Sequence, residues 1–284
     1  MTRRVTVVSL LTALIAALVV PTAQAAPRYR NYVALGDSFV SGPFIPFQRT
    51  DPLSCFKSTQ NYPSVLARKL GVTNFTDISC GGADTSDMFA PQQGFPGQSV
   101  AQLSALKPDT DLVTVSIGGN DIGYNGIILN CGTASLLDPL GSPCKRQYGD
   151  EIAARIAATG PKVAAVLAGI KERAPKALVV VVGYLRIMPP SHGCWPVVPI
   201  SKGDVPYLDG LQQQLNGMLG TQARLAGATF VNPYDISLGR DVCAAPWKKW
   251  VEGIIPTSPA FPVHPNAAGM AAVGNQVASV VFAR

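Results

Sequence analysis

The sequence has few charged side chains and few histidines. Charged residues make up 14% of its 284 residues, and only two residues are histidines. No long run of lysine and arginine occurs, which argues against a nucleic-acid partner. No two cysteines have the Cys-x-x-Cys spacing, and two histidines are too few to complete several zinc sites. We therefore expect no nucleic-acid binding, no bound metal and no cofactor.

A single long apolar run begins the chain. Two arginines precede the apolar segment 5–20, and Ala23-Gln24-Ala25 follows it. This order of positive charge, apolar core and small residues is typical of a secretory signal peptide, cleaved here after Ala25. The alternative is an uncleaved membrane anchor, for which the run is slightly short. We expect residues 1–25 to be a signal peptide and residues 26–284 to be secreted.

The secreted part is large enough for one core and carries a small positive charge. It would retain 21 basic and 17 acidic residues, a net charge of +4. This charge leaves open a weak, transient contact with an anionic lipid surface. About 259 residues lie near the upper limit for a single hydrophobic core, and neither a linker nor a repeat interrupts them. We expect one domain and a monomer.

The secreted part also contains all the cysteines of the chain. They are Cys55, Cys80, Cys131, Cys144, Cys194 and Cys243. An even number of cysteines in an exported chain favours disulfides, although the number alone leaves their connectivity open.

Apolar stretches of strand type alternate with helical patterns. The expected strands are 32–35, 75–78, 112–117, 178–182 and 229–231, and the expected helices are 62–70, 100–106, 151–173, 205–225 and 267–280. This alternation predicts parallel βαβ units, and hence an α/β fold of three layers, α/β/α, around a mainly parallel five-stranded sheet. The Pro- and Gly-rich segments 42–61, 121–149 and 186–204 are expected to be long loops that act as lids or walls.

Two expected strands end in residues that can carry chemistry. Ser38 ends the motif Gly36-Asp37-Ser38, and Asn120 lies in Gly118-Gly119-Asn120-Asp121. A serine after a strand is often only a helix cap, and glycine with Asn-Asp is ordinary turn material. Alternatively, the serine is a nucleophile and the amide donates an N–H to an oxyanion. The Gly-x-Ser-x-Gly motif of the α/β-hydrolases is absent.

The two histidines compete for the role of general base. His192 lies in the proline-rich segment 189–194, which we interpret as a surface wall, whereas His264 lies just before the last expected helix. A lone histidine is more often structural than catalytic, but the base that activates a serine is normally an imidazole, because it titrates near neutrality. His264 is the better candidate.

Four segments together resemble a known family. Gly36-Asp37-Ser38, Gly82, Gly119-Asn120-Asp121 and His264 appear in the order of the four blocks of the SGNH (GDSL-type) hydrolases. Gly82 on its own is equally a turn glycine. The chain is most similar to the secreted actinobacterial lipases and phospholipases of this family, and the resemblance covers essentially all of residues 26–284.

The resemblance implies a fold, a pairing of cysteines and a set of roles. It implies a flavodoxin-like sheet and three consecutive disulfides, so we expect the pairs Cys55–Cys80, Cys131–Cys144 and Cys194–Cys243. By the same resemblance, Ser38 would be the nucleophile and His264 the base. The N–H groups of Ser38 and Gly82 and the side chain of Asn120 would form the oxyanion hole.

One position departs from the usual pattern of the family. Most members have an aspartate three residues before the histidine, where this chain has Phe261. The more similar relatives use a serine–histidine dyad, in which a backbone carbonyl orients the imidazole. We expect the carbonyl of Phe261 or Pro262 to do this for His264. The alternative is a triad completed by Asp235 or Asp241, since triads are recognised by geometry and not by sequence order.

We expect an ester hydrolase of the lipase or esterase type, acting on an ester or lipid through an acyl-enzyme. The alternatives are an esterase that removes acyl groups from polysaccharide, and a non-catalytic binding module on the same fold. The apolar residues of segment 39–47 favour a fatty acyl chain if they line the mouth of the cleft. The other interpretation of this segment is ordinary loop packing.

Overall fold

The computed structural model describes residues 28–284, so the expected signal peptide lies outside the described residues. Its five strands form one sheet in the order β2-β1-β3-β4-β5, and every neighbouring pair is parallel. The strands are β1 (Asn31–Gly36), β2 (Asn74–Asp77), β3 (Leu112–Ser116), β4 (Leu178–Val182) and β5 (Thr229–Val231). This is the flavodoxin-like strand order, so the predicted fold class is confirmed.

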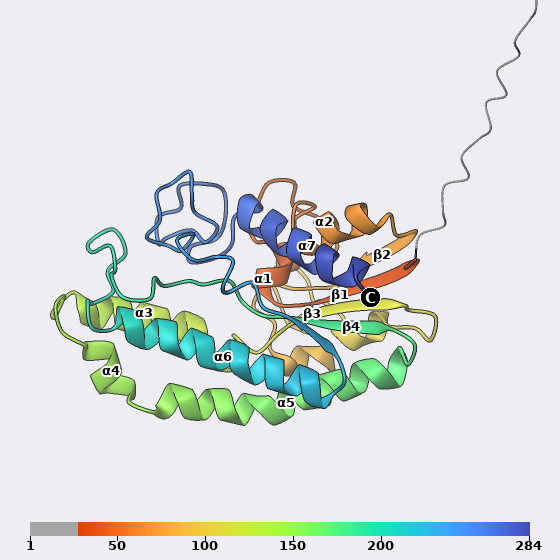
Figure 1. Cartoon of the computed structure of the whole chain (residues 1–284), viewed down its shortest axis with the longest axis horizontal. Helices are drawn as coiled ribbons and strands as arrows, with labels where there is room; N and C mark the ends of the chain where they lie inside the picture. The colour runs from red at the N-terminus through yellow and green to blue at the C-terminus, as the bar shows by residue number, and fades with distance from the viewer. Residues whose placement is uncertain (1–27) are drawn as a thin grey trace, which may run out of the picture.

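Helices cover both faces of the sheet. They are α1 (Ser38–Ser41), α2 (Tyr62–Leu70), α3 (Tyr124–Ser135), α4 (Pro143–Tyr148), α5 (Glu151–Arg173), α6 (Val205–Leu225) and α7 (Ala267–Phe282), with the short 3₁₀ turns η1 (Leu53–Cys55), η2 (Thr85–Met88) and η3 (Gln102–Ala105). Helices α2 and α7 pack together on one side of the sheet, and α5 and α6 pack together on the other (Figure 1). This arrangement is the predicted three-layer architecture.

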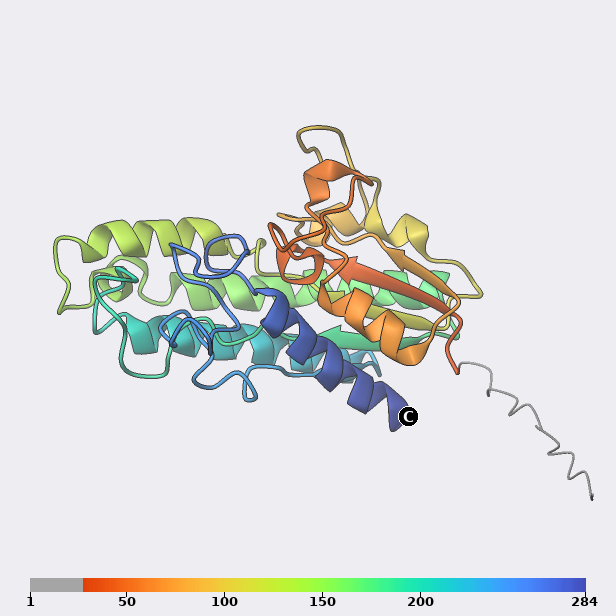
Figure 2. The ribbon, with the colours of Figure 1, turned by 90° about the horizontal axis from the view of Figure 1, so that it is seen from above.

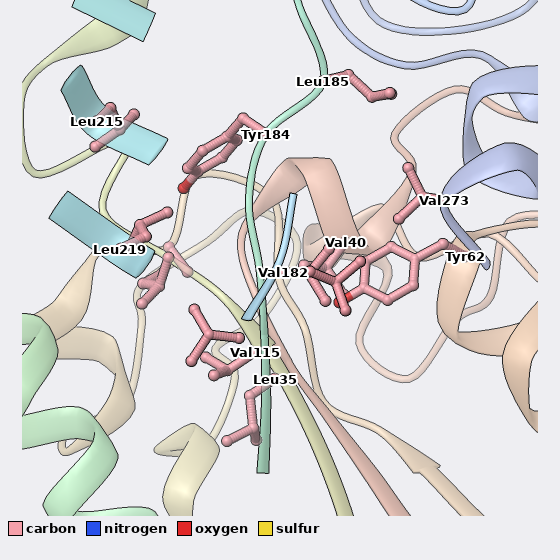
Figure 3. Close-up of a cluster of buried hydrophobic side chains, with 14 of the residues drawn as sticks. Leu35, Val40, Tyr62, Val115, Val182, Tyr184, Leu185, Leu215, Leu219 and Val273 are labelled. Atoms are coloured by element: carbon pink, nitrogen blue, oxygen red, sulfur yellow. The ribbon is translucent and has the colours of Figure 1, made fainter. Parts of the chain in front are cut away.

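The core lies between these layers. The sheet is covered on both faces, which is why the residues of its central strands are nearly all buried and mostly apolar. Figure 3 shows Leu35 of β1 and Val115 of β3 lying between Leu219 of α6 and Tyr62 of α2. Helix α5 has the length and composition that would allow it to cross a membrane. Its apolar side is buried against the layered core, so it is a core helix of this fold.

The structure differs from the sequence-based expectation in two segments. Segment 121–149, expected to be a loop, contains α3 and α4, and segment 100–106, expected to be a helix, forms only the turn η3. Gly123 at the start of α3 and Gly126 and Gly132 within it concealed its apolar periodicity. The segment around η3 is too short to form a stable helix, because helix nucleation is costly.

Long loops and α3 gather at one end of the molecule, the end toward which the strands run (Figure 2). Three disulfides fasten this end. Cys55–Cys80, Cys131–Cys144 and Cys194–Cys243 are the expected pairs, each of them consecutive in the sequence. The first joins the loop after α1 to the turn after β2, and the second joins α3 to α4. The third joins the loops that follow β4 and β5.

Candidate active site

Ser38 lies at the carboxyl end of β1, where the chain turns into the short helix α1. Gly36 has a φ of +147°, and a Cβ there would clash with Val40 and with the Ser116 carbonyl, so the turn requires glycine. The Asp37 side chain caps α1 by accepting a hydrogen bond from the Phe39 N–H at 2.9 Å. This cap fixes the direction in which Ser38 leaves the strand.

Ser38 and His264 are joined by a hydrogen bond, although 226 positions separate them in the chain. The distance from Ser38 Oγ to His264 Nε2 is 2.7 Å. The other ring nitrogen, Nδ1, lies 2.8 Å from the carbonyl oxygen of Pro262. A carbonyl oxygen only accepts hydrogen bonds, so Nδ1 carries the proton and the lone pair of Nε2 faces Ser38. The carbonyl beside the ring is therefore that of Pro262 and not that of Phe261.

A strained turn directs the Pro262 carbonyl toward the ring. Val263 has a φ of +60°, a rare conformation for a β-branched residue. The Phe261 carbonyl, by contrast, accepts a hydrogen bond from the His264 backbone N–H at 3.2 Å. The buried Glu252 secures the segment after the turn, since its backbone N–H donates to the His264 carbonyl and its side chain accepts a bond from Asn266. Backbone strain of this kind is often found at functional sites.

No carboxylate touches the ring of His264 in the described part of the chain. Asp241 is buried and accepts a hydrogen bond from the Cys243 N–H at 3.0 Å, and the Asp235 side chain makes no hydrogen bond to the imidazole. The imidazole instead packs against the rings of Phe39 and Phe261, and each ring centroid is 5.1 Å from that of His264. Burial lowers the pKa of His264 to about 4, and the bond to Pro262 opposes this shift.

Three N–H groups near Ser38 have free donor capacity. Within residues 28–284, neither the Ser38 nor the Gly82 backbone N–H has a hydrogen-bond acceptor. Asn120 donates one side-chain N–H to the Ala83 carbonyl at 2.8 Å, and its second N–H is free. Gly82 has a φ of +79°, and its neighbour Gly81 donates to the Cys55 carbonyl at 2.9 Å. The Cys55–Cys80 disulfide therefore holds the turn that contains Gly82.

Two cavities meet beside Ser38. The smaller, of about 200 Å³, is lined by both catalytic candidates, Ser38 and His264, and by Gly82, Phe44 and Phe261. The larger, of about 500 Å³, is an apolar groove along α3, and we refer to it as the α3 groove. Its lining residues are Tyr124, Asn125, Ile128, Leu129, Gly132, Thr133, Leu136, Pro199, Ile254, Phe261, Pro262 and Val263. Phe261 and Asn125 line both cavities, so the two spaces are neighbours.

The apolar segment 39–47 contributes to the site only in part. Phe39 lies on the ring of His264 and Phe44 lines the smaller cavity, whereas Val40 and Ile45 are buried in the core. Phe47 is 70% exposed and lines neither cavity. Part of the segment therefore lines the site, and the rest is ordinary core and loop packing.

Sequence reasoning missed the α3 groove and a tyrosine behind the site. Tyr184 lies two residues after the end of β4, and its hydroxyl hydrogen-bonds to Asp37 and to Gly119. Its position at the end of a strand, like that of Ser38, was the available signal. His192, the second histidine, lines a separate cavity with Trp195 and Lys202. No cluster of three potential metal ligands occurs among the residues that the structure describes.

Comparisons with known proteins show the family of this chain. The model of the GDSL-like Lipase/Acylhydrolase family matches residues 34–272. Lipase 2 of Streptomyces coelicolor is 42% identical over 255 residues, which are 87% of this chain and 84% of that protein. A lipase of Streptomyces rimosus is 31% identical over 264 residues, 92% of this chain and 90% of its own.

Solved structures share the architecture. The extracellular lipase from Streptomyces rimosus superimposes with a TM-score of 0.69 at 27% identity, over 89% of this chain and 99% of that chain. Phospholipase A1 from Streptomyces albidoflavus gives a TM-score of 0.74 at 24% identity, over 90% and 99% of the two chains, and this likeness concerns the fold alone. By its family match and its curated relatives, this chain belongs to the GDSL-like lipase/acylhydrolase family and is an ester hydrolase.

Proposed function

We propose that this chain is a secreted carboxylic-ester hydrolase that forms an acyl-enzyme on Ser38 and acts on lipids with long apolar acyl chains. The observation that supports the serine mechanism is the 2.7 Å hydrogen bond from Ser38 Oγ to His264 Nε2, beside three N–H groups with free donor capacity. A nucleophile, a base and oxyanion donors at one point are what acyl transfer requires.

The proposed reaction has two halves. His264 Nε2 takes the proton of Ser38 as Oγ attacks the ester carbonyl carbon, and the oxyanion is held by the N–H groups of Ser38, Gly82 and Asn120. The bond from carbon to the alcohol oxygen then breaks, and His264 returns the proton to the departing alcohol. A water molecule, deprotonated by His264, attacks the acyl-enzyme and releases the acid and free Ser38. The Pro262 carbonyl accepts from Nδ1 throughout and so maintains the orientation of the ring.

We expect activity to survive to unusually low pH. Only the neutral imidazole can accept the serine proton, and burial lowers the pKa of His264 to about 4. The final loss of activity should therefore occur as the pH falls through about 4, and not near 6.5, where an exposed imidazole is protonated. The measurement is kcat/KM for p-nitrophenyl butyrate between pH 3.5 and 9. If kcat/KM instead falls to zero with a midpoint near pH 6.5, the imidazole of His264 is not buried as described here.

The α3 groove favours a lipid acyl chain over a polysaccharide ester. One side of α3 presents Tyr124, Ile128, Gly132 and Leu136 at intervals of four residues, so they form a stripe along the helix. From Tyr124 to Leu136 the stripe is about 18 Å long at the rise of an α-helix. Its apolar surface suits an acyl chain, whereas a sugar requires polar partners. The groove begins beside Ser38, because Tyr124 and Asn125 also line a further, small pocket together with Ser38 and His264.

We expect Gly132→Leu to abolish the preference for long acyl chains. The Cβ at this position would meet only the Pro199 carbonyl at 3.8 Å, so the helix accepts a side chain that then fills the groove. On p-nitrophenyl esters, kcat/KM for the palmitate should fall about tenfold, since several buried methylenes lose their contacts. The value for the acetate should change less than twofold.

Gly126→Leu is the matched control for this variant. Gly126 lies on the same helix, but a Cβ there meets nothing within 4 Å, and the residue does not line the groove. This control should keep the wild-type chain-length profile. Equal losses on acetate and palmitate in Gly132→Leu, or an unchanged palmitate value, would remove the groove from the acyl site. Strong activity on acetylated polysaccharide with none on long-chain esters would favour the carbohydrate esterase.

Export and domain organisation are part of the same proposal. We propose that the signal peptide is cleaved after Ala25 and that residues 26–284 form one monomeric catalytic domain, which contacts lipid surfaces transiently. Three disulfides support an oxidising compartment, because such bonds persist mainly in exported proteins. The structurally similar lipase of Streptomyces rimosus is also described as extracellular.

A further inference from the structure

Tyr184 is fixed behind the site by its backbone. The residue follows β4 and is 3% exposed. Asn216 of α6 accepts a hydrogen bond from the Tyr184 N–H and donates one to the Tyr184 carbonyl, both at 2.8 Å. Figure 3 shows the ring beyond the end of β4, near Leu215 of α6. Tyr184 therefore has a defined position that does not depend on its hydroxyl group.

The hydroxyl group of Tyr184 joins two turns of the site. It donates to Asp37 Oδ2 at 2.5 Å and accepts from the Gly119 N–H at 2.9 Å. Asp37 directly precedes Ser38, and Gly119 directly precedes Asn120. A carboxylate only accepts and an amide N–H only donates, so the hydroxyl proton has one direction available. One tyrosine oxygen thus connects the chain at the proposed nucleophile with the chain at the proposed oxyanion donor.

Two further features show how closely this tyrosine fits. A Cβ on Gly119 would lie 3.2 Å from the Tyr184 hydroxyl oxygen and 3.3 Å from its ring carbon Cζ, so glycine at position 119 permits the approach. The Tyr184 ring also packs edge-on against Phe39, with centroids 5.1 Å apart, and Phe39 in turn lies on His264. Tyr184 thus contacts the residue before the proposed nucleophile, the residue before the proposed oxyanion donor, and the aromatic ring that packs against the proposed base.

We propose that Tyr184 is a positioning residue, whose hydroxyl holds the Ser38 turn and the Asn120 turn at the separation that the oxyanion hole requires. This inference rests on the proposed roles of Ser38 and Asn120. Oxyanion donors act only when they are placed in advance, and displacements of an ångström cost large factors in rate. Loss of the hydroxyl should therefore lower kcat more than it changes KM.

The connection depends on the charge of Asp37. Burial raises the pKa of Asp37 to about 7, and the hydrogen bond from Tyr184 opposes this rise. The other titratable groups that face Asp37 are Tyr62 of α2 and Asp121, which follows β3. Ionised Asp37 can only accept from Tyr184. Protonated Asp37 can donate to the tyrosine oxygen and so compete with the Gly119 N–H. The connection is therefore complete above pH 7 and weakens as the pH falls through 7.

The test is Tyr184→Phe, assayed on p-nitrophenyl butyrate from pH 4.5 to 9. The wild-type kcat should show a shoulder near pH 7, with about a tenfold decrease below it. In the variant, kcat at pH 8 should fall roughly 10- to 100-fold with KM within about threefold, because the lost contact acts in the transition state. The shoulder should disappear, since no hydroxyl remains to transmit the charge of Asp37. If Tyr184→Phe does not fold, Asp37→Asn is the second variant: it has no titratable group at position 37, so the shoulder should disappear in it as well.

Tyr32→Phe is the matched control. Tyr32 is equally buried, and its hydroxyl hydrogen-bonds to Thr114 Oγ1 at 2.7 Å in the core, away from the site. This control should keep kcat within twofold and retain the shoulder. A Tyr184→Phe enzyme with kcat within twofold of wild type, or with the shoulder intact, would overturn the inference. Wild type without a shoulder would do the same. Full hydrolysis by Ser38→Ala would instead remove the proposed function itself.

Discussion

Ser38→Ala is expected to lower kcat for short esters by roughly four to six orders of magnitude, because the acyl-enzyme can no longer form. The folded structure should be unaffected, since the substitution removes one hydroxyl at the start of α1 and leaves the Asp37 cap in place. The measurement is turnover of p-nitrophenyl butyrate, together with labelling by a fluorophosphonate. The reagent should add once per chain, at Ser38, and not at all in the variant.

Ser41→Ala is the control for this experiment. Ser41 lies on the same helix and is fully buried, and its hydroxyl has no hydrogen-bond partner within residues 28–284. This variant should keep both turnover and labelling close to wild type. Labelling at a residue other than Ser38, or undiminished hydrolysis by Ser38→Ala, would contradict the serine mechanism.

His264→Ala should lower kcat nearly as much, because a serine hydroxyl is a weak nucleophile without its base. Phe261→Leu, by contrast, should keep kcat for short esters within about threefold. The atom that accepts from Nδ1 belongs to the backbone of Pro262, so the side chain at position 261 contributes only packing to the orientation of the ring. Steady-state kinetics on p-nitrophenyl acetate, with thermal melts to confirm folding, would measure both effects.

Asp235→Ala and Asp241→Asn distinguish a dyad from a triad. Neither carboxylate is a hydrogen-bond partner of His264, so both variants should retain kcat within a few-fold. Asparagine at position 241 keeps an oxygen for the Cys243 N–H and so preserves the local turn. A loss of about 10⁴-fold in either folded variant, the size seen when a triad aspartate is removed, would identify a third member.

The sequence by itself determined the fold class and the identity of the main candidates. Alternation of apolar strand-type runs with helical patterns predicts a doubly covered parallel sheet, because each pattern reflects burial of one element's own residues. The same analysis placed Ser38 and Asn120 at strand ends. In the order β2-β1-β3-β4-β5 these ends belong to neighbouring strands, β1 and β3, on either side of the point where the strand order reverses. Residues at the ends of adjacent parallel strands are brought together by the topology alone.

Other features were decided only by the tertiary structure. The sequence left open whether Phe261 or Pro262 orients His264, and the turn at Val263, with its φ of +60°, places the Pro262 carbonyl beside Nδ1. The wall of the groove was also hidden, because α3 occupies a glycine-rich segment that reads as a loop. Its apolar stripe becomes one wall of a groove only once Phe261 and Ile254 line the same space.

Tyr184 shows most clearly what local patterns cannot predict. Its hydroxyl bonds to Asp37 across 147 positions of the chain, and Ser38 meets His264 across 226. Periodicity and turn chemistry report only on neighbours within a few residues, since each element's pattern records which of its own faces is buried. Which side chain meets which across the sheet depends on strand register and on how closely the layers pack. The sequence therefore determined the catalytic candidates, and the packed structure decided their partners.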